Sequence, residues 1–493
     1  MSFCYRYQAL FVVTWLLFLA GCGSSADPPP WFSGTVKATQ HPLVAQYTIA
    51  VSSAAEVSVE FGTTTAYGRS TASQPVNPSS QVSLLVAGMR PATTYHMRAR
   101  LGFASGATMY DSDHTFTTGT LPNNVGFPQV TVTQGSGSSV QGVDLVSAMQ
   151  SQVTATVFDK DGSLIWYYYD PNESSSTFPI KFLSNGDFLV QYFHDIREVD
   201  LSGKTVREET VDQLNTDLKA AGYSIQAGEF HHDVLRLDNG HWIVLIDLGK
   251  DFQDLPGYPG TTSVLGDALV DLDPNNKPVW VWNTFDHLDV NRHPYMFPDW
   301  THSNAVVYTP DGNLLLSMRH QSWIIKINYA NGAGNGDILW HLGPEGDFSL
   351  AQNDAAQWFY NQHFPTILQS QGTKTTLAMF DNGNTRPDST DQPCEPNNDC
   401  YSRGLTMDLD ESAMTANVVW QYQPGWYSSW GGSIEQLPNG DMETDFSSPG
   451  GGPGRVVETD GSAMPQVVWE MDSSNADFYR AYRIPSLYPG VQW

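Results

Sequence analysis

Four residues in the second half of the chain have side chains that could bind and transfer an anionic group. They are His232, His302, His363 and Arg319. The histidines stand eight, ten and nine residues before the turn glycines Gly240, Gly312 and Gly372, respectively, which is nearly the same place in three successive units. Arg319 lies seven residues after Gly312, so a hairpin would return it to the end where His302 lies. Arginine offers a fork of donors to a tetrahedral oxyanion, and an imidazole can act as nucleophile, acid or base.

A metal site is the alternative interpretation of the same residues. Three histidines alone would suggest zinc, with Asp233 as a fourth ligand. The permanent charge of Arg319 would repel a divalent cation, so we favour an anion site that uses no metal and no cofactor. A metal-dependent hydrolase or lyase stays open as an alternative function.

Two further histidines directly adjoin these candidates. His231 precedes His232, and His320 follows Arg319. Because side chains alternate along a strand, each of these neighbours is expected on the opposite face. The histidine doublet nevertheless leaves open which of its two members faces the site.

A loose repeat positions these residues. From about residue 126 onward, each unit reads as a strand, a turn with glycine, a second strand, and a third strand that ends in tryptophan. The turns are Asn185-Gly186, Asn239-Gly240, Asp311-Gly312, Gln371-Gly372 and Asn439-Gly440. The tryptophans are Trp166, Trp282, Trp340, Trp420 and Trp469, and Thr205-Val206-Arg207 fills this slot in the second unit.

The repeat predicts an all-β fold with a six-bladed β-propeller over residues 126–493, counting a degenerate first unit. The innermost strand of each blade would line a central channel, which would bring the histidines of neighbouring blades together. A stack of β-sandwiches is the alternative, but it would not explain a repeat based on one turn and one tryptophan.

Residues 31–120 are expected to form a separate fibronectin type III or immunoglobulin-like β-sandwich. Short alternating strands are predicted over residues 57–61, 82–86, 94–100 and 114–118. Tyr95 follows Gly88-Met-Arg-Pro at the place of a tyrosine corner. This half has no convergent set of catalytic residue types, so we expect it to serve as a spacer or docking module.

The first residues resemble a bacterial lipoprotein signal. Arg6 is followed by an apolar stretch that is too short to span a bilayer, and then by Leu19-Ala20-Gly21-Cys22. We expect residues 1–21 to be removed, Cys22 to carry a lipid anchor to the membrane, and residues 22–30 to act as a tether. The expected location is the bacterial periplasm or cell envelope, as an outer-membrane lipoprotein.

Charge and cysteine content agree with an exported protein that does not bind nucleic acid. The chain has 52 acidic and 24 basic residues, a formal charge of −28, and so lacks the basic surface that phosphates require. Once Cys4 is lost with the signal and Cys22 carries lipid, Cys394 and Cys400 remain. An oxidising compartment favours a disulfide between them, with a disulfide-forming oxidase as a partner during maturation.

Several short motifs together resemble the bacterial arylsulfate sulfotransferases. They are Phe230-His-His-Asp233, Asp299-Trp-Thr-His-Ser-Asn304, Ser317-Met-Arg-His-Gln321, Gln362-His363, Phe380-Asp-Asn-Gly383 and the run from Tyr479 to Tyr488. The order and spacing of the motifs make the set more specific than any one of them. Members of that family are periplasmic six-bladed propellers that move a sulfuryl group between phenols, by a ping-pong route through a sulfohistidine.

The resemblance implies a role for each candidate. His363 would be the nucleophile, while His302, His232 and Arg319 would bind the sulfuryl oxygens and manage protons. The substrates would be an aryl sulfate donor and a phenolic acceptor. Further candidates for substrate binding are His231, His320, Asn304, Trp300 and Trp426, where the two tryptophans could stack on flat rings. A lipoprotein with a degenerate propeller that binds a surface without catalysis is the remaining alternative.

Overall fold

The computed structural model describes residues 31–493, except for residues 150–154, 174–178, 352–353, 388–391 and 395–399. The expected signal, lipidation site and tether lie outside the described residues. Strands dominate the described chain, and its one α-helix is α1 (Val211–Ala220). None of its helices has the length and apolar character needed to cross a membrane.

Two packed sheets form the N-terminal β-sandwich. The first contains β1 (Phe32–Ala38), β2 (Ala45–Val51) and β6 (Ser80–Val86). The second contains β4 (Arg69–Ser70), β3 (Ala55–Gly62), β7 (Thr94–Gly102) and β8 (Thr108–Tyr110), with β5 (Gln74–Val76) on β3 and β9 (His114–Thr117) on β7. The Tyr95 hydroxyl accepts a hydrogen bond of 3.0 Å from the Arg90 backbone N–H, which is the tyrosine corner that the sequence predicts.

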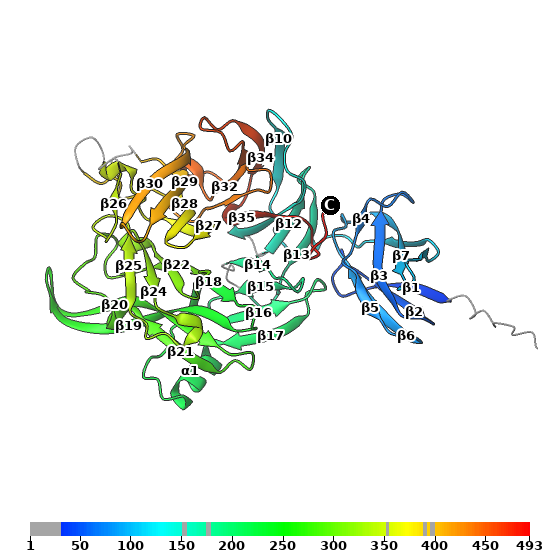
Figure 1. The fold of residues 1–493 in the computed structure, drawn as a ribbon, viewed down its shortest axis with the longest axis horizontal. Coiled ribbons are helices and arrows are strands. Elements are labelled where there is room, and N and C mark those ends of the chain that lie inside the picture. Colours follow the sequence, from blue (N-terminus) through cyan, green and yellow to red (C-terminus); the bar gives the residue numbers. More distant parts are fainter. Residues whose placement is uncertain (1–30, 150–154, 174–178, 352–353, 388–391, 395–399) are drawn as a thin grey trace, which may run out of the picture.

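Six antiparallel sheets follow and form the propeller, so the predicted fold class is confirmed (Figure 1). Blade 1 contains β35 (Asp477–Ile484), β11 (Val143–Met149), β12 (Ala155–Asp159) and β13 (Leu164–Tyr168). Blade 2 contains β14 (Ile180–Phe182), β15 (Phe188–Gln191), β16 (Asp195–Val199) and β17 (Thr205–Thr210). Blade 3 contains β18 (Phe230–Arg236), β19 (Trp242–Leu255), β20 (Tyr258–Leu272) and β21 (Pro278–Asn283).

The remaining blades continue the same order from the inside outward. Blade 4 contains β22 (Ser303–Tyr308), β23 (Leu314–Met318), β24 (Trp323–Ile327) and β25 (Ile338–Leu342). Blade 5 contains β27 (His363–Gln371), β28 (Lys374–Asp381), β29 (Arg403–Asp410) and β30 (Thr415–Tyr422), with the short β26 (Ser349–Leu350) parallel to β30. Blade 6 contains β31 (Ser433–Gln436), β32 (Met442–Phe446), β33 (Arg455–Thr459) and β34 (Val467–Ser473).

Strands from both ends of the propeller sequence close the ring. The C-terminal strand β35 pairs with β11 as the innermost strand of blade 1. In the other direction, β10 (Val130–Gln134) adds an outer strand to blade 6 by pairing with β34. Closure therefore requires residues more than 340 positions apart, as in the pair Val143 and Ile484.

The repeated turns and tryptophans have separate structural roles. All five turn glycines adopt a positive φ, between 63° and 94°. Each tryptophan lies in the fourth strand of its blade, counted from the channel. Four of their indole N–H groups donate to a backbone carbonyl of the next blade, at Leu201, Gly336, Ser462 and Lys160. In blade 2, Arg207 replaces tryptophan and donates to the carbonyls of Gly240 and Asp273 in blade 3. The repeat thus marks the contacts between blades.

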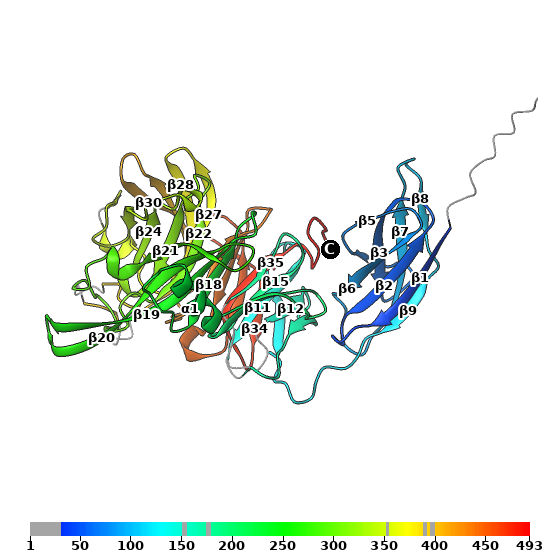
Figure 2. The ribbon, with the colours of Figure 1, turned by 90° about the horizontal axis from the view of Figure 1, so that it is seen from below.

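The sandwich packs beside the first blades of the propeller (Figures 1 and 2). His41 Nε2 lies 2.8 Å from the Tyr167 carbonyl oxygen in β13. The indole N–H of the C-terminal residue, Trp493, donates to the Ser70 carbonyl of the sandwich at 2.9 Å. The sandwich and the propeller part of the chain are therefore in contact through His41 and through Trp493.

Candidate active site

Three neighbouring innermost strands carry the same irregularity where their histidines stand. The pairing register shifts between Phe230 and Val234 in β18, between Ser303 and Ala305 in β22, and between His363 and Thr366 in β27. A bulge of this kind redirects a side chain out of the regular alternation. His232 and His302 also adopt positive φ values of 56° and 46°, a strained conformation that is common at functional sites.

His363 is buried and presents one free ring nitrogen. Its Nδ1 lies 2.7 Å from Oδ1 of Asn382, whose amide nitrogen donates to the carbonyls of Ser428 and Gly431. Because those two bonds identify the Asn382 oxygen as the acceptor, Nδ1 of His363 carries the proton, and Nε2 keeps its lone pair. Burial and the charge of Arg319 hold the pKa of His363 well below its ordinary value. His363 is therefore a neutral imidazole at neutral pH.

His302 is oriented by a carboxylate. Its Nδ1 lies 2.7 Å from Oδ2 of Asp299, which leaves Nε2 available. Although burial works against it, the hydrogen bond from His302 lowers the pKa of Asp299, so the carboxylate stays charged at neutral pH. The His302 ring lies 4.6 Å from the ring of His232 and 4.4 Å from that of His320, measured between centroids.

The histidine doublet forms a relay. Nε2 of His231 is 3.3 Å from the buried carboxylate of Asp267, and its Nδ1 is 2.9 Å from Nδ1 of His232. Burial opposes protonation, but the neighbouring carboxylate of Asp267 raises the pKa of His231, which favours a proton on the Nδ1 that faces His232. Burial and the neighbouring His302 lower the pKa of His232, which accepts at Nδ1 and keeps its proton at Nε2. Of the two histidines, His232 is the one that contacts His302.

Arg319 stands at the centre of a donor network. Met318 is the last residue of β23, and Arg319–Gln321 form a 3-10 turn instead of continuing the strand. The guanidinium donates to Nε2 of His320 at 2.6 Å and to the Ser429 carbonyl at 2.9 Å. Its buried Nε–H has no hydrogen-bond partner among the described residues. A buried donor without an acceptor suits an anionic ligand that supplies the acceptor.

Because of the 3-10 turn, His320 does not lie on the face that strand alternation predicts. Strand alternation places His320 on the far face, but its ring stacks on His302 at an interplanar angle of 20°. Its Nδ1 donates to the Asp299 carbonyl, and burial lowers its pKa to about 3. His320 therefore acts as a neutral acceptor that orients Arg319, because both of its ring nitrogens are engaged. His231, likewise expected on the far face, lies directly against His232.

The structure does not bring the aromatic candidates to the cluster. Trp300 is 1% exposed, and its indole stacks on Phe285 and donates to the Arg292 carbonyl. Trp426 packs against Phe446 under the guanidinium of Arg455. Both tryptophans thus have packing roles. Asn304 is buried at the channel wall, where its amide nitrogen donates to the Gln362 carbonyl at 2.7 Å.

Tyr479 and Tyr295 complete the surroundings of the cluster. Tyr479 stands between two histidines, with ring centroids 6.0 Å from His232 and 6.1 Å from His363. Tyr295 lies 5.4 Å from the Arg319 guanidinium and edge-on to His320 at 5.2 Å. Neither tyrosine, nor Asn382, is among the site residues predicted from the sequence. Tyr479 and Asn382 do lie in motifs that carry the family resemblance, and this position could have identified them as site residues.

One group of metal-ligating side chains occurs among the described residues, made of Asp299, His302 and His320. Nδ1 of His302 is hydrogen-bonded to Asp299. Both ring nitrogens of His320 are also hydrogen-bonded, Nε2 to the Arg319 guanidinium and Nδ1 to the Asp299 carbonyl. A cation held here would stand beside that permanent positive charge. The arrangement fits an anion better than a metal ion.

The disulfide predicted between Cys394 and Cys400 is present, with a Cα–Cα distance of 5.0 Å. Cys394 also donates its backbone N–H to the Arg386 carbonyl at 3.0 Å. The buried guanidinium of Arg386 donates to Asp381, which is the last residue of β28 and directly precedes Asn382. The disulfide therefore braces the segment that orients His363.

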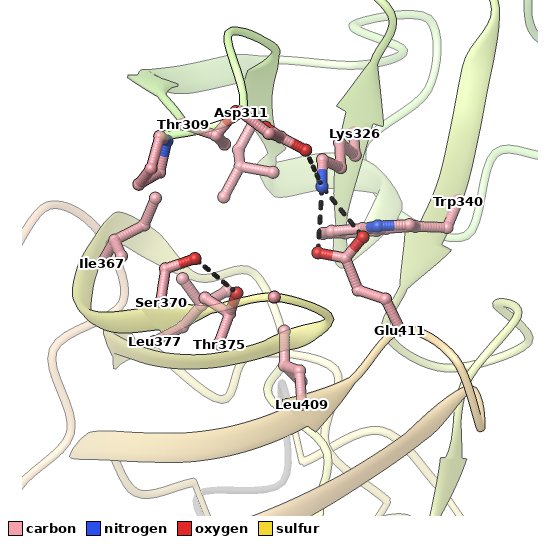
Figure 3. A pocket seen from close by; sticks show the side chains of 13 residues that line it. Thr309, Asp311, Lys326, Trp340, Ile367, Ser370, Thr375, Leu377, Leu409 and Glu411 are labelled. Carbon is pink, nitrogen blue, oxygen red and sulfur yellow. Dashed lines mark hydrogen bonds and ion pairs between the residues drawn. The ribbon is translucent and has the colours of Figure 1, made fainter.

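A cavity of about 260 Å³ lies between blades 4 and 5 on the side of the hairpin turns (Figure 3). It contains the ammonium of Lys326, paired with Asp311 at 2.8 Å and Glu411 at 2.9 Å. These charges satisfy one another, and none of the residues of the histidine cluster lines this cavity. The cavity is therefore separate from the candidate active site.

The propeller part of the chain is similar to a known protein family. A family model described as Arylsulfotransferase (ASST) matches residues 129–480. No curated protein matches the chain. Similar solved structures include a protein of unknown function from Bacteroides caccae, with 11% identity over 69% of this chain and 98% of that chain and a TM-score of 0.43. Others are a Lactobacillus plantarum protein (10% identity, 68% and 83% covered, TM-score 0.36) and a streptogramin B lyase (11%, 70% and 98%, 0.31).

Proposed function

The chain belongs to the arylsulfotransferase family, and we propose that it moves a sulfuryl group from a phenolic sulfate ester to a phenolic acceptor through a sulfohistidine at His363. The family establishes the enzyme as a transferase that acts on aryl sulfates. The observation that carries the sulfohistidine proposal is the bond between Asn382 and Nδ1 of His363, which leaves a buried, unprotonated Nε2 beside the cationic Arg319.

In the first half-reaction, Nε2 of His363 attacks the sulfur of the aryl sulfate. A nitrogen–sulfur bond forms, the bond from sulfur to the aryl oxygen breaks, and the phenolate leaves with the electron pair. Arg319 and the Nε2–H of His232 supply donors for the sulfuryl oxygens, where negative charge is concentrated in the transition state. The leaving phenolate takes its proton from Nε2 of His302, which enters this step as the imidazolium with its Nδ1–H on Asp299 and leaves it as the neutral ring.

The second half-reaction reverses these steps with a new phenol. His302 takes the proton of the acceptor hydroxyl at Nε2, the phenolic oxygen attacks sulfur, and the nitrogen–sulfur bond breaks. His363 regains its lone pair and is ready for the next donor. A water molecule in place of the phenol would give hydrolysis, so the ratio of transfer to hydrolysis reports how well the acceptor is positioned.

Brief mixing with 4-nitrophenyl sulfate, followed by acid-free quenching and peptide mass spectrometry, tests this proposal. We expect a gain of about 80 Da, the mass of SO₃, on the peptide with His363, and its loss on adding phenol. His363→Ala should abolish both the adduct and turnover. His341→Ala is the matched control, because His341 lies on blade 4 and pairs with Asp347 away from the cluster. Full turnover by His363→Ala without an adduct would refute the proposal.

For the cellular setting, we propose an envelope lipoprotein anchored through Cys22, with the disulfide introduced by an oxidase during maturation. The signal-like sequence before Cys22 and the disulfide of Cys394 and Cys400 support this proposal. Labelling of expressing bacteria with a fatty-acid analogue tests the anchor. We expect lipid on the wild-type protein and none on Cys22→Ala, whereas equal labelling of both would refute it.

A further inference from the structure

Behind the histidine cluster, the central channel contains a second cavity, which we term the axial cavity. Its volume is about 340 Å³, and strands β14, β18, β22, β27 and β35 contribute its walls. These strands surround the centre of the ring (Figure 1). The wall residues stand further along the strands than the histidines do, toward the hairpin turns. The axial cavity therefore lies at the opposite end of the channel from the candidate active site.

A buried group of charged side chains lies between the axial cavity and the histidine cluster. Oδ1 of Asp233 lies 2.7 Å from Nζ of Lys181 and 3.3 Å from a terminal nitrogen of Arg480. The Arg480 side chain is fully buried, whereas the Lys181 side chain is 20% exposed. Among the described residues that line the cavity, Asp233 is the one carboxylate and Lys181 the one cationic side chain, while Arg480 contacts Asp233 from outside the lining. Burial lowers the pKa of Lys181 although Asp233 opposes this shift, and with Lys181 protonated these three side chains carry a net positive charge.

The walls of the axial cavity are mostly apolar and partly aromatic. Phe182, Leu235 and Val307 line it, and the rings of Phe364 and Tyr482 lie parallel within 7°, with centroids 6.2 Å apart. The hydroxyl of Tyr482 is buried and has no hydrogen-bond partner among the described residues. An unpaired hydroxyl in an apolar setting costs free energy that an acceptor on a ligand would recover.

We propose that the axial cavity binds a flat aromatic anion, with the ring against the apolar walls and the anionic group on Lys181 and the Tyr482 hydroxyl. Ligand sites combine such apolar walls with a few convergent polar groups in cavities of this size. Charge complementarity favours an anion, because the one carboxylate among the described lining residues is already shared by Lys181 and Arg480. No histidine lines the cavity, so it is a binding site and not a second site of transfer.

Isothermal titration with 1-naphthalenesulfonate tests the proposal, because its carbon–sulfur bond prevents sulfuryl transfer. We expect the wild-type enzyme to bind two molecules per chain, of which one competes with 4-nitrophenyl sulfate. Lys181→Met should weaken the non-competing site by about tenfold or more, and Tyr482→Phe by about fivefold. Val307→Trp should abolish that site by filling the cavity. Lys204→Met, on the exposed β16–β17 turn, is the matched control and should keep both sites.

A measurement on the unaltered protein covers the case in which a variant folds poorly. Saturating 1-naphthalenesulfonate should protect Lys181 from acetylation, while Lys204 in the same sample reacts as before. A single site per chain that competes with substrate would overturn the proposal. So would equal acetylation of Lys181 with and without the probe, or two unchanged sites in a folded Val307→Trp.

Discussion

At His363, the proposed nucleophile, the choice between an amide and a carboxylate partner influences the protonation state of the ring. His302 and His231 contact the carboxylates of Asp299 and Asp267, but His363 contacts the neutral amide of Asn382. A carboxylate favours the imidazolium, which has no lone pair for attack. Burial and Arg319 lower the pKa of His363 although the hydrogen bond to Asn382 raises it, so the ring stays neutral with its tautomer fixed by the amide.

The pH dependence of the first half-reaction follows from this arrangement. The pKa of His363 is well below its ordinary value because of burial and Arg319, so the neutral form persists as the pH falls. We expect the acid limb of kcat/KM for 4-nitrophenyl sulfate to lie below pH 6. Asn382→Asp should raise the pKa of His363 and move that limb upward by about one pH unit or more.

A matched variant separates this local effect from a change in net charge. Asn335→Asp adds the same charge in an exposed turn, where Asn335 contacts Asp337, and should leave the pH profile unchanged. An identical profile for Asn382→Asp and the wild-type enzyme would contradict the role of Asn382.

Arg319 is the strongest candidate for stabilising the transferring group. Arg319→Met removes the buried donor and should lower kcat/KM by about a hundredfold or more, the usual effect of losing one preorganised donor. Arg236→Met, which removes a blade 3 arginine that pairs with Glu198 of blade 2, should stay within about twofold of wild type. Steady-state kinetics with folded proteins measure both values. A loss below tenfold for Arg319→Met would indicate that other groups hold the sulfuryl oxygens.

At the level of elements, the closing strand β35 places the guanidinium of Arg483 among carboxylates of blades 1 and 6. Arg483 contacts Asp144 of β11 at 2.8 Å, Glu443 of β32 at 2.8 Å, and Glu458 of β33. Burial raises the pKa of Glu435 to about 8, and its carboxyl accepts the Arg483 backbone N–H. One guanidinium therefore links blade 6 to blade 1.

Removing that guanidinium should destabilise the propeller more than removing an exposed one. Arg483→Met leaves buried carboxylates without their cation and should lower the free energy of unfolding by about 3 to 5 kcal/mol. Arg455→Met, on the partly exposed pair with Asp472, should cost less than about 1 kcal/mol. Urea unfolding followed by tryptophan fluorescence measures the difference. Equal midpoints for the two variants would contradict the closing role of Arg483.

For the whole molecule, the C-terminal residue joins the two parts of the chain. The Trp493 indole donates to Ser70, and the guanidinium of Arg69 lies 4.8 Å from its ring. The ring also fills the space beside Gly88, where an added Cβ would come within 2.3 Å of it. The sandwich is thus docked by a contact that does not involve the channel.

Trp493→Ala should release the sandwich while transfer activity stays within about twofold of wild type. We expect the segment of residues 119–129 to be cleaved about tenfold faster by a protease, because local opening controls such cleavage. Trp31→Ala, at an exposed tryptophan of the sandwich, serves as the control. Unchanged cleavage would show that other contacts, such as that of His41 with Tyr167, hold the sandwich alone.

Much of this architecture could be predicted from sequence because its signals are local. A turn glycine needs a positive φ within a few residues of its strands, and a tryptophan at a strand end marks an outer strand. These signals predicted the six blades, the tyrosine corner at Tyr95, and three histidines at one end of the channel. The pairing of Cys394 with Cys400 was predicted from the cysteine count and the expected oxidising compartment.

Only the tertiary structure decided how the site residues are used. Alternation failed at His320 because the strand ends at Met318, and at His231 because a bulge interrupts β18. Trp300 is buried by contacts with Phe285, which is distant in sequence. The proton positions on His363 and His232 depend on Asn382 and on the relay from Asp267. Those partners come from other segments, so strand period and turn chemistry, which act over a few residues, do not determine them.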